Sequence, residues 1–182
     1  MKKNTLRRIY KQKRKELTES QILDIQENIY TQFFEYDFSQ IQFVHVFLSI
    51  EKQKEINTNP IIDYLLSHQK TVVVSKSDFS NNTLQHYIFD RSTDLKINTY
   101  GIPEPVNAKE IDVKEIELVI VPLLISDVKK YRVGYGKGFY DRFLSACKNE
   151  VKTVGINFFK PVEKIEDLNK FDVALDQIIY PK

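Results

Sequence analysis

Two segments decide how this chain folds: Leu118-Val-Ile-Val-Pro122 and, nine residues later, Arg132-Val-Gly-Tyr-Gly-Lys-Gly-Phe-Tyr-Asp141. The first is the most β-like run of the chain, and it ends at a proline, which cannot donate a hydrogen bond to a sheet. The second holds three of the five glycines of the chain and leads into apolar residues at helical spacing. A strand, a glycine-rich turn and a helix in this order indicate a βα unit of an α/β protein.

Apolar β-like runs alternate with helical patterns on both sides of these segments. Strands are predicted at Phe43 to Leu48, Thr71 to Val74, Leu84 to Phe89, Thr153 to Asn157 and Gln177 to Tyr180. Helices are predicted over residues 2–17, from the capping box at Thr18 to Gln21, after Thr58 and Pro60, and through Phe143, Leu144 and Cys147, with a turn-rich loop at Gly101 to Pro105. The pattern predicts a three-layer α/β/α fold with a mainly parallel sheet, and residues 1–182 read as one domain.

The composition excludes several classes of protein. The chain has 182 residues, of which 42% are hydrophobic and 12% aromatic, so it is not intrinsically disordered. A single cysteine, Cys147, cannot form a disulfide scaffold and reads as a packing residue. The apolar stretches are too short and too polar for a membrane span, and the basic N-terminus lacks the apolar core of a signal peptide. We therefore expect a cytoplasmic monomer.

Charge is concentrated at the N-terminus. Residues 1–16 hold eight basic side chains and one acidic side chain, and the other 166 residues hold 19 basic and 24 acidic ones, which gives them a net charge of −5. On a helix, Lys3, Arg7, Lys11 and Arg14 fall in a narrow arc beside the apolar side. Such an arc can be a solvated face, a contact to a polyphosphate or a nucleic-acid arm, although no aromatic residues alternate with these cations for base stacking.

The glycine-rich segment has the features of a phosphate-binding loop. Gly134, Gly136 and Gly138 let backbone N–H groups approach an anion closely, and Arg132 and Lys137 add full positive charges. The helix that follows presents the positive end of its dipole to the same place. The segment contains neither GxxxxGK[ST] nor GxGxxG, so it is neither a Walker A loop nor a dinucleotide-binding motif of the Rossmann type. The competing interpretation is a tight strand-to-helix turn.

Other chemistry-bearing residues are few. Asp141, in the first turn of that helix, fits either dipole compensation or a carboxylate that holds Mg²⁺ against phosphates. The three histidines have no metal-binding spacing, and His45, inside an apolar run, reads as a core residue with its hydrogen bonds satisfied. No nucleophile motif such as GxSxG is present.

The segment RVGYGKGFYDRFL after LVIVP resembles the signature of the 5-formyltetrahydrofolate cyclo-ligase family, also called methenyltetrahydrofolate synthetases. Further motifs follow in the family's order: K-x-x-x-R at Lys3 and Arg7, FLS followed by EINT at Glu55 to Thr58, GIPEP at 101–105, and Asp172 and Asp176. The chain departs from the family pattern at Lys130 and Lys137, where glycine is usual, and at Phe139, where tyrosine is usual. The resemblance spans nearly the whole chain.

The resemblance implies an enzyme that uses ATP and Mg²⁺ to convert 5-formyltetrahydrofolate to 5,10-methenyltetrahydrofolate, with release of ADP and phosphate. By this resemblance ATP binds Lys3, Arg7, Arg132, Gly134, Tyr135, Gly136, Lys137, Gly138, Phe139 and Tyr140. The folate contacts Leu48, Glu55 and the segment from Tyr135 to Phe139. Asp141 and Asp172 hold Mg²⁺, and Arg132, Lys137 and Asp141 act in catalysis. Nucleic acid and membrane are not expected partners.

Three alternatives remain open at the level of the sequence. The chain could be another ATP-dependent phosphotransferase with a different small-molecule acceptor. It could be a nucleic-acid-binding domain with a basic arm, whose affinity would fall steeply with salt. It could also bind folate without turning it over, because Lys130 is expected to tolerate a positive φ poorly.

Overall fold

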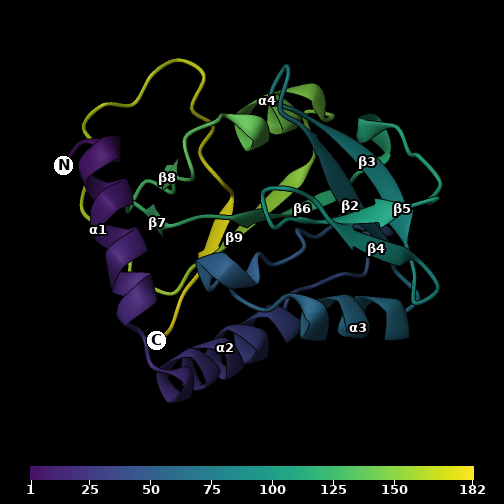
Figure 1. The fold of residues 1–182 in the computed structure, drawn as a ribbon, viewed down its shortest axis with the longest axis horizontal. Coiled ribbons are helices and arrows are strands. Elements are labelled where there is room, and N and C mark those ends of the chain that lie inside the picture. Colours follow the sequence, from purple (N-terminus) through teal and green to yellow (C-terminus); the bar gives the residue numbers. More distant parts are fainter.

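The computed structural model describes residues 1–182 and is built around one six-stranded sheet of order β10-β9-β6-β1-β2-β3 (Figure 1). Five of these strands are parallel and β3 runs antiparallel to β2, so the prediction of a mainly parallel sheet is confirmed. The strands are β1 (Phe43–His45), β2 (Thr71–Asp78), β3 (Thr83–Phe89), β6 (Leu118–Pro122), β9 (Lys152–Ile156) and β10 (Gln177–Ile179).

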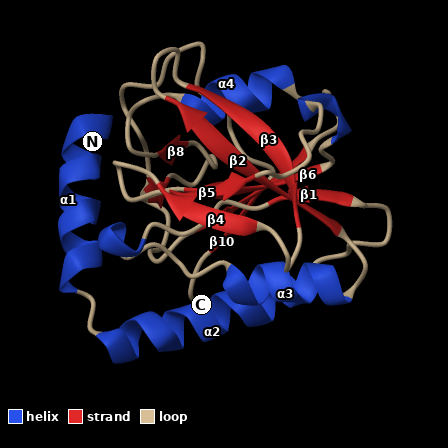
Figure 2. Ribbon diagram, turned by 45° about the vertical axis from the view of Figure 1, so that its right-hand side comes forward, coloured by secondary structure: helices blue, strands red, loops and turns tan.

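Strand β6 shows why the sheet carries helices on both faces. Leu118 and Ile120 belong to one buried cluster, whereas Val119 and Val121 belong to another, because successive side chains of a strand point to opposite faces. Helices α2 (Glu19–Phe34) and α3 (Asn59–Ser67) cover the first face, and α4 (Phe139–Ala146) covers the second (Figures 1 and 2). The three-layer α/β/α prediction is confirmed.

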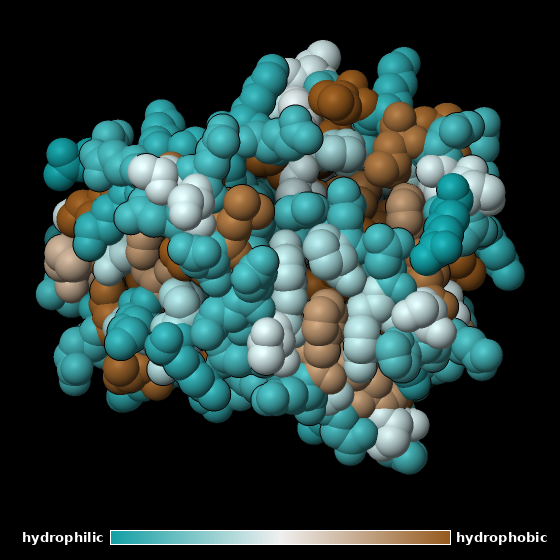
Figure 3. Space-filling view, turned by 90° about the horizontal axis from the view of Figure 1, so that it is seen from below, coloured by the Kyte–Doolittle hydropathy of each residue, from teal (hydrophilic) through white to brown (hydrophobic).

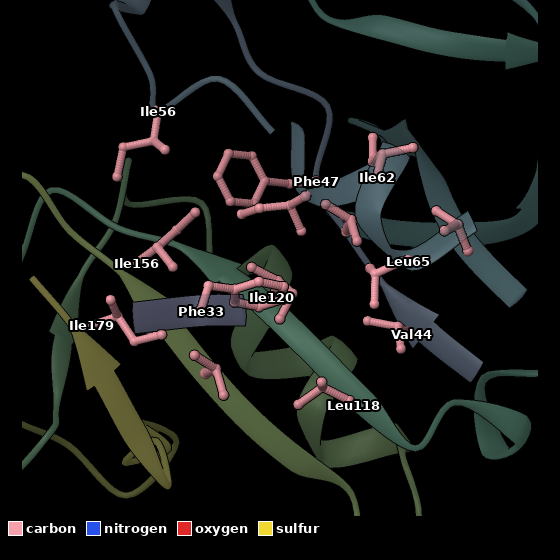
Figure 4. Close-up of a cluster of buried hydrophobic side chains, with 14 of the residues drawn as sticks. Phe33, Val44, Phe47, Ile56, Ile62, Leu65, Leu118, Ile120, Ile156 and Ile179 are labelled. Carbon is pink, nitrogen blue, oxygen red and sulfur yellow. The ribbon is translucent and has the colours of Figure 1, made fainter. Parts of the chain in front are cut away.

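The larger cluster lies between the sheet and helices α2 and α3. Phe33 of α2 and Leu65 of α3 are fully buried there against β-strand residues such as Val44 and Ile120 (Figure 4). Burying a side chain of this size stabilises the fold by about 1.5–3 kcal/mol. The outer faces of α2 and α3, seen in Figure 3, are mostly hydrophilic with small separate apolar patches. These helices are therefore amphipathic elements with one solvated side.

Helix α1 (Lys3–Glu16) stands at one end of the sheet instead of covering a face (Figure 1). Its buried stripe consists of Leu6, Tyr10 and, unexpectedly, Arg14. Leu6 and Tyr10 pack in a third cluster that includes Ile125 of β7 (Ile125–Ser126) and Val133 of the two-residue strand β8 (Arg132–Val133). This packing fixes α1 next to the segment that leads into the glycine-rich loop.

Most element predictions are confirmed, including the capping box, in which Thr18 accepts from the backbone N–H of Gln21. Three predictions were wrong in part. The strand expected at Phe43 to Leu48 ends at His45, the helix α4 ends at Ala146 with Cys147 as its C-cap, and the loop expected at Gly101 to Pro105 contains strand β5 (Pro103–Val106). Strand β5 pairs only with β4 (Asp94–Ile97), and an isolated two-stranded ribbon tolerates prolines because both strands are edges.

Two short 3₁₀ helices, η1 (Glu51–Gln53) and η2 (Val113–Glu115), complete the fold. Lys130, for which a positive φ was expected to be unfavourable, has φ of 66°. Its backbone N–H donates to Asp127 and its Nζ donates to the carbonyl of Asp176, which holds the turn in this conformation. No helix in the structure combines the length and apolarity needed to cross a membrane.

Candidate active site

One large cavity of about 1020 Å³ opens at the carboxyl ends of the parallel strands. Its floor includes His45 of β1, Ser75 of β2 and Pro122 of β6. Ligands of open α/β sheets bind outside the carboxyl ends of the strands, because loops and helix N-termini converge there. The site therefore lies where the fold alone would place it.

Every residue that the sequence analysis assigned to ATP, folate or Mg²⁺ lines this cavity. They are Lys3, Arg7, Leu48, Glu55, Arg132, Gly134, Tyr135, Gly136, Lys137, Gly138, Phe139, Tyr140, Asp141 and Asp172. These residues come from α1, from the loop after β1, from the glycine-rich loop with α4, and from the segment before β10. The fold thus brings segments that are far apart in the sequence to one cavity.

The glycine-rich loop requires glycine at two positions. Gly138, the N-cap of α4, has φ of 71°, and Gly136 has φ of 96°, both in the left-handed region that side chains rarely adopt. A Cβ atom on Gly136 would lie 3.0 Å from the guanidinium carbon of Arg7. The loop is therefore pressed against α1, and Arg7 Nε donates to the carbonyl of Gly134 at 2.9 Å.

The cations of the cavity fall into two groups. Arg132 is buried and already has hydrogen-bond partners, since its guanidinium donates to Asp141 at 2.6 Å and to the carbonyl of Val173 at 2.7 Å. Lys3 is paired with Asp172. Arg7, Lys137 and Arg142 line the cavity without a carboxylate partner. These three side chains are therefore the charges most available to an incoming polyanion.

Asp141 and Asp172 are the carboxylates of the cavity that could bind a divalent cation. Both carboxylates face Arg132, whose pKa is lowered by burial and raised again by these two charges. No group of three or more His, Cys, Asp or Glu side chains in the structure could hold a metal ion. Mg²⁺ commonly takes one or two carboxylates together with phosphate oxygens and water, and two carboxylates at a phosphate-binding loop fit that donor set.

The cavity also holds a shielded carboxylate, Glu55, which lies next to Tyr135 of the glycine-rich loop. Its Oε1 accepts from the hydroxyl of Tyr135 at 2.6 Å, and its Oε2 accepts from the backbone N–H of Ile50 at 2.8 Å. Burial raises the pKa of Glu55, and these two hydrogen bonds together with the charge of Arg14 oppose that rise. Burial also raises the pKa of Tyr135, so its hydroxyl remains a donor.

Aromatic side chains form another part of the cavity lining. Phe79 stacks on Tyr100 with ring centroids 4.0 Å apart, and it meets the edge of Phe139 at 5.3 Å. Phe139, which replaces the family's usual tyrosine, therefore keeps an aromatic contact. Phe79 and Tyr100 were missed by the sequence analysis, because they lie in separate hairpin turns whose approach depends on the pairing of β2, β3, β4 and β5.

A row of polar side chains crosses the floor beneath α4. Ser75 lies between two imidazoles, with His45 Nε2 at 2.7 Å and His86 Nδ1 at 3.0 Å from its hydroxyl. Burial lowers the pKa of His86 to about 4 and lowers that of His45 as well. His45 is in the core as expected, but its Nδ1 has no hydrogen-bond partner, so the expectation of a fully satisfied histidine was wrong.

The model of the 5-formyltetrahydrofolate cyclo-ligase family matches residues 1–181. The chain belongs to the 5-formyltetrahydrofolate cyclo-ligase family. It is therefore a ligase of folate one-carbon metabolism, and the family uses ATP.

Individual proteins similar to this chain support its assignment to the family. A probable 5-formyltetrahydrofolate cyclo-ligase from Schizosaccharomyces pombe is 33% identical over 150 residues, which cover 80% of this chain and 72% of that protein. The 5-formyltetrahydrofolate cyclo-ligase of Escherichia coli is 27% identical over 181 residues, which cover 94% and 96% of the two chains. The solved structure of an Aquifex aeolicus 5,10-methenyltetrahydrofolate synthetase superposes with a TM-score of 0.83 at 25% identity and covers 98% of this chain and 89% of its own.

Proposed function

We propose that the cavity binds ATP and 5-formyltetrahydrofolate side by side and joins them in one phosphoryl transfer. The observation that supports this most directly is the polarity of the cavity. One part, the nucleotide end, is the glycine-rich loop with Arg7 and Lys137. The other part, the folate end, has the shielded carboxylate of Glu55, which Tyr135 links to that loop, together with the stacked rings of Phe79 and Tyr100. A polyphosphate suits the first end, whereas a ring system with N–H donors suits the second.

In this proposal the phosphates of ATP lie along the glycine-rich loop from Gly134 to Gly138. Backbone N–H groups and the dipole of α4 stabilise negative charge there. Arg7 and Lys137 contact the phosphates, and Tyr140 packs behind them. Phosphoryl transfer needs positioning and charge neutralisation far more than covalent chemistry from the protein. A site that contains glycines and cations but no nucleophile is therefore sufficient for this phosphoryl transfer.

The folate lies at the other end, with its pterin N–H groups donating to Glu55 and its rings against Leu48 and Phe139. The formyl oxygen attacks the γ-phosphorus, the P–O bond to ADP breaks, and the oxygen becomes part of a phosphate leaving group. The neighbouring nitrogen then bonds to the formyl carbon and loses its proton, and the C–O bond breaks to release inorganic phosphate. The products are ADP, phosphate and 5,10-methenyltetrahydrofolate.

The paired charges have supporting roles in this scheme. Arg132 holds Asp141 in place at 2.6 Å, and Lys3 holds Asp172. Asp141 and Asp172 would bind Mg²⁺ together with phosphate oxygens, and that ion would neutralise charge on the phosphates. Arg132 and Lys137 stabilise the charge that spreads over the transferred group.

We also propose that residues 1–182 act as one domain and as a cytoplasmic monomer. Supporting this, α1 and the segment around Asp172 line the same cavity, so a single chain supplies residues from both of its ends to one site. The mass in solution checks this: light scattering should give the 21.5 kDa of one chain, and a doubled mass would contradict it.

The decisive experiment follows the absorbance of methenyltetrahydrofolate when 5-formyltetrahydrofolate is added with and without ATP and Mg²⁺. Product should form only with both, and ADP should be released in equal amount. Equal ADP release without folate, or with unrelated acceptors, would contradict the proposal and favour another phosphotransferase.

A further inference from the structure

Arg14 occupies a place in α1 where an apolar residue is expected. It follows Leu6 and Tyr10 at intervals of four, and all three are buried, Arg14 with only 4% of its surface exposed. A buried guanidinium is costly unless it is well paired, and no carboxylate contacts this one directly. Its Nε has no hydrogen-bond partner at all. The buried charge of Arg14 therefore costs stability that an apolar residue at this position would not.

The partners of Arg14 lead into the folate end of the cavity. Its Nη2 donates to the carbonyl of Leu123 at 2.6 Å, which anchors the side chain, and its guanidinium lies over the ring of Phe158. Its Nη1 donates to the Tyr135 hydroxyl at 3.0 Å, and that hydroxyl donates to Glu55 at 2.6 Å. Hydrogen bonds in such a chain polarise and strengthen one another.

The same helix contacts the nucleotide end. Lys3 and Arg14 lie eleven positions apart on α1, or about 16 Å along its axis, with Arg7 between them. Lys3 and Arg7 line the part of the cavity next to the glycine-rich loop. The C-terminal end of α1 contacts the loop that carries Glu55, because Lys54 Nζ donates to the carbonyls of Lys15 and Leu17 at 2.9 Å.

We propose that Arg14 is a positioning residue that fixes the Glu55 carboxylate against the folate through Tyr135, and that α1 thereby couples folate binding to ATP binding. ATP bound to Arg7 and the glycine-rich loop immobilises α1 and Tyr135, which favours the geometry of Glu55 that the folate requires. By linkage the folate tightens ATP binding by the same factor. This inference rests on the proposed function and assigns Arg14 a role within it.

The charge state of Glu55 gives a second readout. The groups that face it are Tyr135, Arg14 and Tyr140, and of these only Arg14 carries a positive charge that opposes the rise of the Glu55 pKa. Loss of that charge raises the pKa of Glu55 further. Protonation would then remove the acceptor for the folate at a higher pH than in the unchanged protein.

The test measures the dissociation constant of 5-formyltetrahydrofolate by calorimetry, with and without a non-hydrolysable ATP analogue and Mg²⁺, at several pH values. Coupling free energies between sites typically correspond to 5- to 150-fold changes in affinity, so the analogue should tighten folate binding at least about fivefold in the unchanged protein. Arg14→Gln should reduce this factor to less than about twofold and move the low-pH loss of folate binding to higher pH. Arg8→Gln, an exposed position of the same helix, should change neither.

Several outcomes decide the inference. Arg14→Gln with unchanged coupling and an unchanged pH midpoint overturns it. If Arg14→Gln does not fold, Tyr135→Phe interrupts the same chain without removing the guanidinium, and full coupling in that variant overturns the inference equally. Failure of the unchanged protein to bind 5-formyltetrahydrofolate at all would instead overturn the proposed function.

Discussion

The two ends of the cavity are built in different ways. The nucleotide end depends mainly on one continuous segment, 132–141, which forms a strand, a turn and the start of α4. The folate end combines Leu48 and Glu55 from the loop after β1 with Phe79 and Tyr100 from two separate hairpin turns. A continuous segment can carry its chemistry as a motif, whereas a composite surface exists only after folding. The nucleotide end is therefore evident in the sequence, whereas Phe79 and Tyr100 of the folate end are not.

The largest effect is expected at the nucleotide end, from Arg132→Ala. Arg132 is buried, and its loss removes charge-assisted hydrogen bonds worth about 1.5–3 kcal/mol, so kcat/KM for ATP should fall roughly 10- to 150-fold. Steady-state kinetics and thermal melting would measure this, with Arg91→Ala, an exposed arginine, as the control. Parent-like turnover in Arg132→Ala would show that the loop is structural.

At the folate end, Glu55→Gln should raise the Michaelis constant for 5-formyltetrahydrofolate by about tenfold or more and leave that for ATP nearly unchanged. The substitution removes a charged acceptor, and a hydrogen bond to a charged group contributes about 1.5–3 kcal/mol. Glu51→Gln, an exposed glutamate of η1, is the matched control. A larger effect on ATP than on folate would reverse the assignment of the two ends.

The contribution of α1 is expected to be similar or slightly smaller. Lys3→Ala together with Arg7→Ala should weaken ATP binding by at least tenfold, or ~1.4 kcal/mol, because both cations line the cavity. Melting should also occur at lower temperature, since the pair of Lys3 with Asp172 is largely buried. Lys2→Ala with Arg8→Ala removes two exposed charges from the same turns and should do neither. Normal ATP kinetics with lost nucleic-acid affinity would favour the nucleic-acid alternative.

The smallest effect is expected from Lys130→Gly, just before the nucleotide loop. Glycine adopts a φ of 66° without the strain that a side chain introduces, and this gain outweighs the loss of the exposed hydrogen bond from Lys130 Nζ to Asp176, so the free energy of unfolding should rise by about 0.5–1 kcal/mol. Kinetic constants should not change, because Lys130 does not line the cavity. Lys129→Gly, whose φ is not positive, should destabilise instead, and equal melting shifts for both would contradict this explanation.

The extent to which the sequence predicted the structure follows the same division. Leu118 to Val121 specified a strand buried on both faces, and the Thr18 capping box located the start of α2, because these signals are local. Strand β5 was not predicted, because its prolines are acceptable only when its sole partner is β4. Arg14 was counted with the exposed cations, since helical periodicity alone cannot tell that Tyr135, 121 residues away, would accept its hydrogen bond.

The pair of Lys3 with Asp172 joins residues 169 positions apart in the chain, and the amino group of Met1 pairs with Glu166 nearby. During synthesis, α1 therefore emerges long before the segment that contains Glu166 and Asp172. Until that segment has emerged, α1 lacks these partners, and the cavity wall beside the glycine-rich loop is incomplete. A chain that stops short of Asp172 accordingly has no complete site at which to consume ATP.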